Sequence, residues 1–105
     1  MSAQLTVIRW RDIPAQVVAK SGRQSARREL SPRFQVAIDR AAMYAGLFGT
    51  DDYLGEWVRD SRPCSDDLEA EASSEADRLE AEFNSERLND LANNGGLRRG
   101  TETGD

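Results

Sequence analysis

The first part of the chain has the residue pattern of two β-strands. Residues 4–11 are rich in β-branched and aromatic side chains and point them alternately to two sides. The run Asp12-Ile13-Pro14 interrupts this pattern, because proline fixes φ and lacks an N–H donor. Residues 15–20 resume it with two valines. The pattern predicts an antiparallel hairpin, followed by a polar loop or ragged strand extension over residues 21–29.

The middle of the chain predicts a helix. Ser31-Pro32 is a helix start signal, with a hydroxyl N-cap and proline at the first helical position. Gly49 is placed to end the helix. Apolar side chains recur at three- and four-residue steps and form one stripe of Phe34, Ala37, Ile38, Ala41, Ala45 and Phe48, which Val36, Met43, Tyr44 and Leu47 widen.

The segment 53–59 fits two structures. The pairs Tyr53/Trp57 and Leu54/Val58 lie four residues apart, which favours a short helix. The β-branched and aromatic residues, with Gly55 among them, favour a strand. We favour the strand, because an isolated hairpin is marginally stable and a third strand would support it.

The last third predicts a long amphipathic helix after the connector Arg62-Pro63-Cys64. The helix opens at Ser65 and continues to Phe83 along a narrow, alanine-rich stripe, which could pack on the sheet or against a partner helix. Asn84-Ser85 breaks or re-caps it, residues 87–92 continue helically, and a stop follows at 93–96. We expect one α+β domain over residues 1–96, with a small, mostly antiparallel sheet, two or three helices packed on one face, and a disordered tail over 97–105.

Composition excludes most catalytic machinery. The 105 residues include one cysteine and no histidine. The chain alone therefore offers no Ser-His or Cys-His pair and no histidine-ligated zinc or haem. The lone Cys64 fits a reducing compartment. The N-terminus lacks the pattern of a signal peptide, and the longest apolar-rich stretch, residues 41–48, is too short to cross a bilayer. We expect a soluble, cytoplasmic protein without membrane contact.

The net charge of −5 conceals an asymmetry. Residues 1–50 carry eight basic and three acidic side chains, which gives +5, and residues 51–105 carry six and sixteen, which gives −10. A basic half alone would suggest nucleic acid, but the acidic half would oppose a polyanion. We therefore expect the halves to neutralise each other or to lie on separate solvated faces.

Several motifs together resemble a known family. They are Trp10-Arg11-Asp12-Ile13-Pro14-Ala15-Gln16-Val17, Asp39-Arg40-Ala41-Ala42-Met43, Gly49-Thr50-Asp51-Asp52-Tyr53-Leu54 with Trp57, and Arg62-Pro63-Cys64 before an acidic helix. From about Leu5 to Gly96 the chain resembles the small bacterial "virulence factor" domains. Stand-alone members are common in alphaproteobacteria, beside genes of methyl transfer and folate one-carbon metabolism. The resemblance implies an accessory protein and supplies no catalytic residues.

Two groups of residues are candidates for binding. The first, chosen for specificity in an interaction, is Trp10, Arg11, Asp12, Tyr53 and Trp57. The second is a basic face of Arg9, Arg11, Arg23, Arg27 and Arg28, on which Arg9 and Arg11 share one strand face. The paired carboxylates Asp51/Asp52 and Asp66/Asp67 fit helix capping better than metal binding, and Cys64 lacks the partners that activate a thiol.

These observations predict a non-catalytic accessory or interaction protein. Its partner would be a larger bacterial enzyme or complex, for which the resemblance suggests a link to one-carbon metabolism. No cofactor and no metal is expected. The alternative is a small ligand- or nucleic-acid-binding domain that uses the N-terminal arginines, although nucleic acid is the less expected partner. The sequence leaves the oligomeric state open.

Overall fold

A computed structural model describes residues 3–47, 49 and 51–97 of the chain. Its elements combine a four-stranded antiparallel sheet with four helices, which confirms the predicted α+β class. In chain order they are β1 (Ala3–Trp10), β2 (Ile13–Ser21), β3 (Gln24–Glu29), α1 (Pro32–Ala45), α2 (Asp51–Gly55), β4 (Trp57–Cys64), α3 (Leu68–Glu82) and α4 (Ser85–Asn93).

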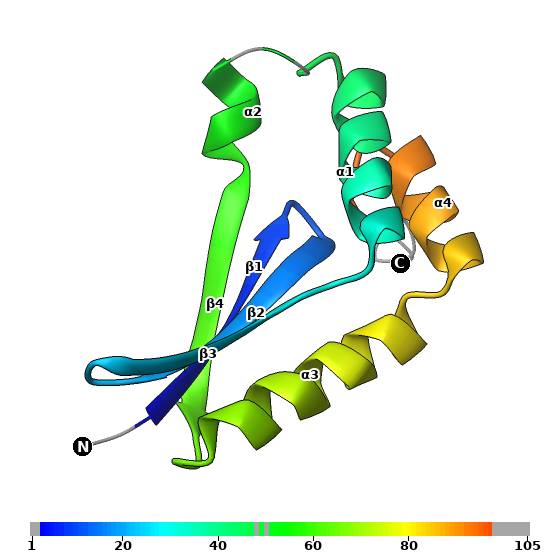
Figure 1. Ribbon diagram of the computed structural model, residues 1–105. Coiled ribbons are helices and arrows are strands. Elements are labelled where there is room, and N and C mark those ends of the chain that lie inside the picture. The colour runs from blue at the N-terminus through cyan, green and yellow to red at the C-terminus, as the bar shows by residue number, and fades with distance from the viewer. Residues whose placement is uncertain (1–2, 48, 50, 98–105) are drawn as a thin grey trace, which may run out of the picture.

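The sheet has the strand order β3-β2-β1-β4 (Figure 1). The predicted hairpin is confirmed, because β1 and β2 pair directly, with Leu5 opposite Ala19 and Val7 opposite Val17. Their register shifts between Ile8 and Arg9. This irregularity lies opposite Pro14. Proline has no N–H to donate to a regular ladder, so in a central strand it is found at such bulges. β4 pairs with the other side of β1 over all eight of its residues.

Two expectations about strands need correction. The polar segment expected as a loop or ragged strand extension contains a full strand, β3, which forms because it pairs with β2 rather than because of its own alternation. The segment 53–59 is divided: residues 53–55 end the short helix α2 and residues 57–59 begin β4. The connector Arg62-Pro63-Cys64 is the end of the same strand, so the sheet has four strands instead of three.

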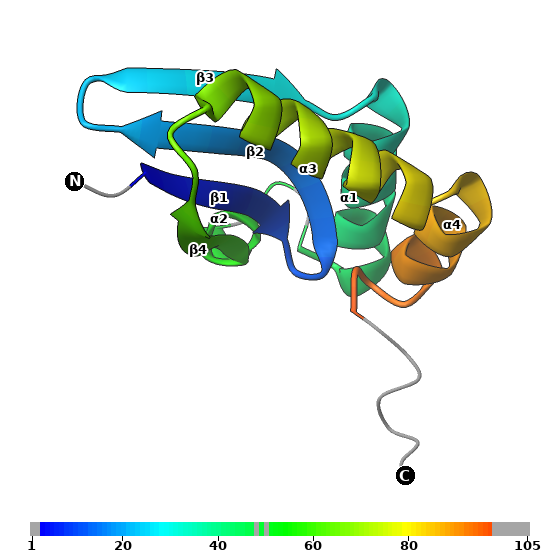
Figure 2. The ribbon, with the colours of Figure 1, turned by 90° about the horizontal axis from the view of Figure 1, so that it is seen from below.

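The sequence suggested that the helices all pack on one face of the sheet, but they do not. α3 runs across β2 and β3 on one side of the sheet and leaves β1 and β4 uncovered by a helix there (Figure 2). α1 and α4 pack against each other at one end of the sheet, and α2 lies on the side away from α3 (Figure 1). The open choice for the long helix is therefore settled, because its stripe of Leu68, Ala72, Ala76 and Leu79 is buried within the chain.

The helix boundaries follow most of the signals, with shifts. Pro32 opens α1 as predicted, but the helix ends at Gly46, whose left-handed φ of 76° closes it before Gly49. Asp67 rather than Ser65 caps α3, accepting a hydrogen bond from the Ala70 amide. Asn84 re-caps the chain at the start of α4, as expected. Val36, Met43 and Tyr44, expected to widen the apolar stripe of α1, are exposed.

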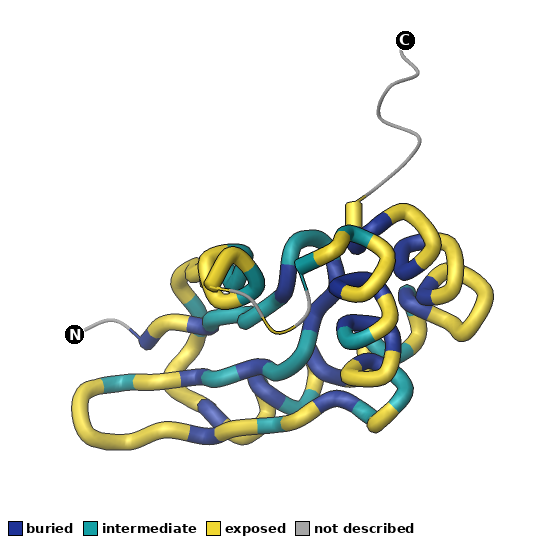
Figure 3. Tube along the Cα trace, turned by 90° about the horizontal axis from the view of Figure 1, so that it is seen from above, coloured by how far each residue is buried: buried dark blue, intermediate teal, exposed yellow. Residues whose placement is uncertain are grey.

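The buried side chains form one cluster, concentrated where α1 and α4 meet the sheet (Figure 3). Trp10, Phe34, Leu5, Ile13 and Ile38 are its largest fully buried members. None of the helices in the described ranges is both long and apolar enough to cross a membrane. The tail expected over 97–105 lies outside the described residues except for Leu97.

The charge asymmetry is resolved inside the molecule. Four ion pairs join the basic first half to the acidic second half: Arg9–Asp60, Arg11–Glu56, Arg28–Glu69 and Arg33–Glu80. Two of them link the first half to α3, which carries much of the negative charge. The expected mutual neutralisation of the halves is thus confirmed for these residues, although exposed pairs of this kind each contribute only about 0–1 kcal/mol.

Candidate functional site

A groove between α3 and the β1–β4 half of the sheet has a volume of about 890 Å³. We call it the α3–β4 groove. Its apolar part consists of Leu5, Val7, Pro14, Leu79, Phe83 and Leu97. Its charged part consists of Arg9, Asp12, Asp60, Arg62, Glu75, Arg78 and Glu82. A protein surface with apolar anchors and a charged rim has the composition of an interface more than of a small-molecule pocket.

The groove follows from where α3 packs. The buried stripe of α3 is short of bulky side chains, with alanine at positions 72 and 76, so the helix lies close to β2 and β3. Leu5 and Val7 of β1 point to the same face as Ala19 and Val17. No helix of the described chain covers that face as far as β4, and Val7 remains half-buried there. The uncovered strip between the helix and the sheet edge is the groove.

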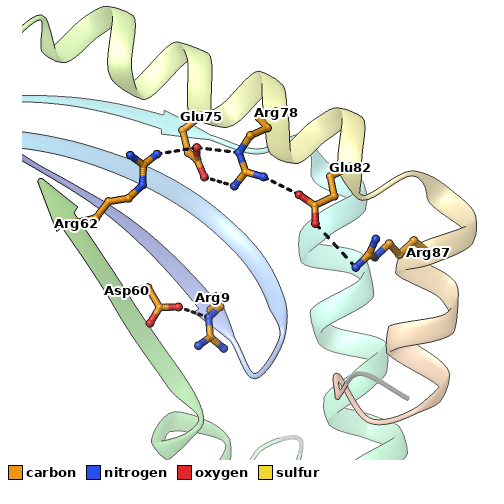
Figure 4. Close-up of polar contacts among 7 residues, drawn as sticks. All are labelled: Arg9, Asp60, Arg62, Glu75, Arg78, Glu82 and Arg87. Atoms are coloured by element: carbon orange, nitrogen blue, oxygen red, sulfur yellow. Dashed lines mark hydrogen bonds and ion pairs between the residues drawn. The ribbon is translucent and has the colours of Figure 1, made fainter. Parts of the chain in front are cut away.

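A chain of ion pairs crosses one wall of the groove (Figure 4). At its centre, the side chain of Glu75 is only 6% exposed. Arg78 makes a bidentate contact with this carboxylate, in which Nη2 donates to Oε2 at 2.6 Å and Nε donates to Oε1 at 3.1 Å. Arg62 of β4 donates to Oε1 from the other side at 3.1 Å. Arg78 also reaches Glu82 at 2.8 Å, and Arg87 lies 3.9 Å from Glu82.

This network fixes the charges of the groove. Hydrogen bonds from Arg78 lower the pKa of Glu75 and outweigh the effect of its burial, with a further contribution from Arg62. At neutral pH the carboxylate is therefore ionised and fully engaged. On β4, the Asp60 carboxylate accepts a hydrogen bond from Arg9 at 2.6 Å. The Glu75 carboxylate is poorly suited to general acid–base work, which needs a pKa near the working pH and a proton to exchange.

Cys64, at the end of β4, shows no sign of an activated thiol. It is partly buried and free. Burial raises the pKa of its thiol, and the nearby Glu71 raises it further. The described residues contain no group of three or more Cys, Asp or Glu side chains that could hold a metal ion.

The predicted interaction residues Trp10, Arg11 and Asp12 hold the β1–β2 turn to the rest of the molecule. Trp10 is fully buried and donates from Nε1 to the Tyr53 carbonyl at 2.8 Å. Arg11 adopts a left-handed φ of 52°, lies over the Trp10 ring and donates to the Gly95 carbonyl at 2.9 Å. The Asp12 amide donates to the Gly96 carbonyl at 2.8 Å. These contacts give the turn a structural role and leave Trp10 inaccessible to a partner.

Tyr53 and Trp57 extend the same cluster toward the surface. The Tyr53 ring stacks on Trp10 at 5.5 Å, and Trp57 meets Tyr53 edge-on at 6.2 Å. Trp57 is half-buried and borders a smaller hollow of about 300 Å³ on the face away from α3. Gln16 also borders this hollow, and its Oε1 is buried with no hydrogen-bond partner among the described residues. Of the five predicted interaction residues, Trp57 is therefore the aromatic one nearest to an accessible recess.

The structure does not bring the five predicted basic residues onto one face. Arg27 and Arg28 are neighbours in β3 and so point to opposite faces. Arg11 lies in the turn after β1, so it does not share a strand face with Arg9. Three of the five are engaged with carboxylates: Arg9 with Asp60, Arg11 with Glu56 and Arg28 with Glu69. The expected arginine face is therefore dispersed.

Sequence reasoning missed the central residues of the groove, Arg62, Glu75 and Arg78. One signal was present, because Glu75 falls on the apolar stripe of α3, between Ala72 and Leu79. An acidic residue at such a position needs a cationic partner if it is buried. Arg78, three residues later on the same helix, supplies one. Arg62 comes from β4 and could be found only through the tertiary fold.

Comparison with known proteins gives one match. The family model described as "Virulence factor" matches residues 8–92, which include the β1–β2 turn, β4 and the ion pairs of the groove. No curated protein and no solved structure matched.

Proposed function

The chain belongs to the virulence factor family, whose description names no biochemical activity. We propose that the protein is a non-catalytic interaction module that binds a segment of a larger protein partner in the α3–β4 groove. The observation that carries this proposal is the combination of apolar anchor positions with charges already fixed by their neighbours. Preorganised charges can recognise a partner without being reordered on binding.

The charge of the groove favours a protein segment over a polyanion. Its lining carries the cations Arg9, Arg62 and Arg78, whereas its anions are Asp12, Asp60, Glu75 and Glu82. Each of the three guanidinium groups contacts at least one of these carboxylates. A phosphate backbone would have to compete with them, while a segment with apolar side chains would contact Val7, Pro14 and Phe83.

The resemblance to proteins encoded beside methyl-transfer genes extends the proposal to the partner. We carry it forward as the expectation that the larger partner is an enzyme or complex of one-carbon metabolism and that this chain acts as its accessory subunit. The identity of the captured partner tests this finer statement separately from the use of the groove. A partner from another process would leave the groove proposal standing and overturn the metabolic link.

The test is capture from the native host with two matched variants. Val7→Lys places a charged group in the groove, whereas Val18→Lys makes the same change at a half-buried position on the opposite face of the sheet. We expect the unmodified chain and Val18→Lys to retain the same partner, and Val7→Lys to lose it. Circular dichroism checks that both variants are folded. A partner retained equally by both variants, or by neither, would contradict the proposal.

The alternative of nucleic-acid or ligand binding through the N-terminal arginines has less support, because the structure disperses those side chains and engages Arg9, Arg11 and Arg28 with carboxylates. It makes a separate prediction. Nucleic-acid binding should weaken steeply with salt and disappear when Arg9, Arg11 and Arg23 are replaced by alanine.

A further inference from the structure

The outer edge of β4 is open, and the ladder between β1 and β4 shows which backbone groups face it. The Arg11 amide donates to the Glu56 carbonyl at 3.1 Å, in line with the register that places Trp10 opposite Trp57. Hydrogen-bonded and non-hydrogen-bonded pairs alternate in an antiparallel ladder. Val58, Asp60 and Arg62 therefore bond to β1. The N–H and C=O groups of Trp57, Arg59 and Ser61 point away from β1, toward the edge.

The position of Pro63 agrees with this assignment. It belongs to the same outward-facing set as Ser61, so its missing N–H leaves no gap in the ladder with β1. β4 is the last strand of the sheet and bonds to no further strand of the described chain. Figure 1 shows β4 running along this border of the sheet. An eight-residue strand with unpaired outward groups can template the addition of another strand.

The side chains around Ser61 are complementary to themselves. In an antiparallel pair of two copies centred on Ser61, Asp60 of each copy lies opposite Arg62 of the other. Opposite charges at such positions stabilise a pair of strands, and like charges destabilise it. Registers centred on Arg59, Asp60 or Arg62 would each place identical charges opposite one another. Among the registers centred on residues 59 to 62, the charge order of β4 therefore favours the one about Ser61.

From this geometry we propose that two copies of the chain pair through β4, in antiparallel register about Ser61, to form one continuous eight-stranded sheet. Ser61 exchanges two backbone hydrogen bonds with its copy, and the Arg59 amide donates to the Pro63 carbonyl of the second copy. Pro63 has no N–H to donate to the Arg59 carbonyl of the second copy, so the hydrogen-bonded ladder between the two copies ends at this pair. The pairing has two-fold symmetry, as most homodimers do.

The pairing also changes the groove. Asp60 and Arg62 point to the face that carries Val7 and Leu5, and both line the α3–β4 groove. Residues opposite each other in a sheet share a face, so the second copy places its own Arg62 and Asp60 at the rim. The hydrogen bond from Arg9 to Asp60 uses Oδ2, so Oδ1 is outside that bond. The two grooves then join across the two-fold axis. Self-pairing does not depend on the larger partner proposed above.

The test measures the mass of the full chain in solution by light scattering and sedimentation over a wide range of concentration. We expect a dimer of twice the 11.7 kDa chain mass at high concentration. Ser61→Pro removes an outward N–H without breaking the ladder to β1 and should give a monomer. Arg27→Pro is the matched control: by the same alternation, counted from the bond between the Leu30 amide and the Ala15 carbonyl, Arg27 faces outward on the opposite edge. It should leave the dimer intact.

A charge exchange separates self-pairing from effects within the chain. Asp60→Arg and Arg62→Asp each place like charges opposite each other and should raise the dimer dissociation constant by tenfold or more. The double exchange restores opposite charges between copies, although it leaves Arg9 and Glu75 facing like charges within each copy. Recovery of the dimer in the double variant is expected only for β4 pairing. A chain that is monomeric throughout, or a dimer indifferent to Ser61→Pro and to both single exchanges, would overturn the proposal.

Discussion

At the scale of single residues, Glu75 stands out because its charged side chain is buried. Among the described residues it is the one buried charged residue, and two guanidinium groups donate hydrogen bonds to its carboxylate. Removing such a charge from water is costly unless partners compensate it. The energy of the group therefore depends on Arg62 and Arg78 together, and so does the wall that it forms in the α3–β4 groove.

We predict that Glu75→Gln lowers the free energy of unfolding by about 1–3 kcal/mol, because it removes the negative charge that two guanidinium groups share and replaces the acceptor of Arg78 Nη2 with an NH2 donor. The figure stays at this level because the side chains of Arg62 and Arg78 are more than half exposed and can turn to water. Glu82→Gln, about two helical turns away, changes a half-buried carboxylate and should cost less than about 1 kcal/mol. Urea unfolding at neutral pH measures both. Equal losses would show that Glu75 has no special role.

The same residue gives a pH dependence with a defined sign. The pKa of Glu75 is lower in the folded state than in the unfolded chain, where it has its ordinary value. Its contribution is therefore fully present above the ordinary glutamate pKa and is lost as the pH falls through the folded-state value. We expect stability to decline in acid less steeply for Glu75→Gln than for the unmodified chain. Parallel declines in unfolding experiments along a pH series would contradict this assignment.

Gly96 makes a residue-scale prediction about the close approach of the C-terminal loop to Trp10. Its φ is 89°, and a Cβ there would lie 2.9 Å from Cζ3 of the buried indole ring. Gly22 has a similar φ of 60°, but a Cβ there would meet nothing within 4 Å. Gly96→Ala should therefore cost more than about 2 kcal/mol, whereas Gly22→Ala should show only the backbone strain of about 1 kcal/mol. Thermal unfolding of the two variants compares them, and equal shifts would argue against the close packing.

At the scale of elements, the sequence predicted those whose cause is local. The β1–β2 hairpin and α1 carry their own alternation, proline and cap signals, and they formed close to the expected residues. β3 has a single buried residue, Ala26, so no alternation could identify it. The change from α2 to β4 depends on pairing between Trp57 and Trp10. A strand defined by a partner 47 positions away gives no signal in its own segment.

The start of α1 shows how a second element can replace a local cap. Ser31 occupies the N-cap position, but its side chain makes no capping bond to the helix. Instead, Glu80 of α3 accepts from the Ser31 amide at 2.6 Å and from its hydroxyl at 2.9 Å, and it also pairs with Arg33 at 2.9 Å. Burial opposes ionisation of Glu80, but the bonds from Ser31 and Arg33 prevail and its pKa is lowered. The carboxylate therefore joins α1 to α3.

We predict that Glu80→Ala lowers the free energy of unfolding by about 1–2 kcal/mol, a loss comparable to that of a helix cap. The amide of Ser31 should also exchange faster with solvent. Glu86→Ala is the control, because Glu86 is an exposed acidic residue in the first turn of α4 and should change stability by less than about 0.5 kcal/mol. Urea unfolding and hydrogen exchange test the pair. If Ser31 exchange is unchanged, Glu80 does not hold the start of α1.

At the scale of the whole molecule, the β1–β2 turn connects parts that are far apart in the chain. The Arg11 amide bonds to the carbonyl of Glu56, between α2 and β4, and the Arg11 guanidinium reaches both the Glu56 carboxylate and the Gly95 carbonyl. The sequence singled out Trp10, Arg11 and Asp12 by their motif but could not assign their structural role. Their partners lie 43 to 84 positions away, and such partners become visible only when the fold brings them together.

The connection predicts a coupled loss of order when Arg11 is replaced. Arg11→Ala removes the hydrogen bond to Gly95, the ion pair with Glu56 and the contact with the Trp10 ring. In that contact the guanidinium carbon of Arg11 lies 5.2 Å from the centre of the ring. We expect a loss of about 1–3 kcal/mol in stability. We also expect faster hydrogen exchange at the amides of both Arg11 and Asp12. The Arg11 amide bonds to Glu56, and the Asp12 amide bonds to Gly96 in the C-terminal loop.

The control for this prediction is Lys20→Ala, an exposed position on β2 that should change stability by less than about 0.5 kcal/mol. Faster exchange confined to the Asp12 amide would mean that Arg11 anchors only the C-terminal loop. Unchanged exchange at both amides would mean that the Trp10 ring and the backbone bonds hold the turn without the guanidinium. Only a joint response shows that one side chain closes the sheet, α2 and the C-terminal loop into a single unit.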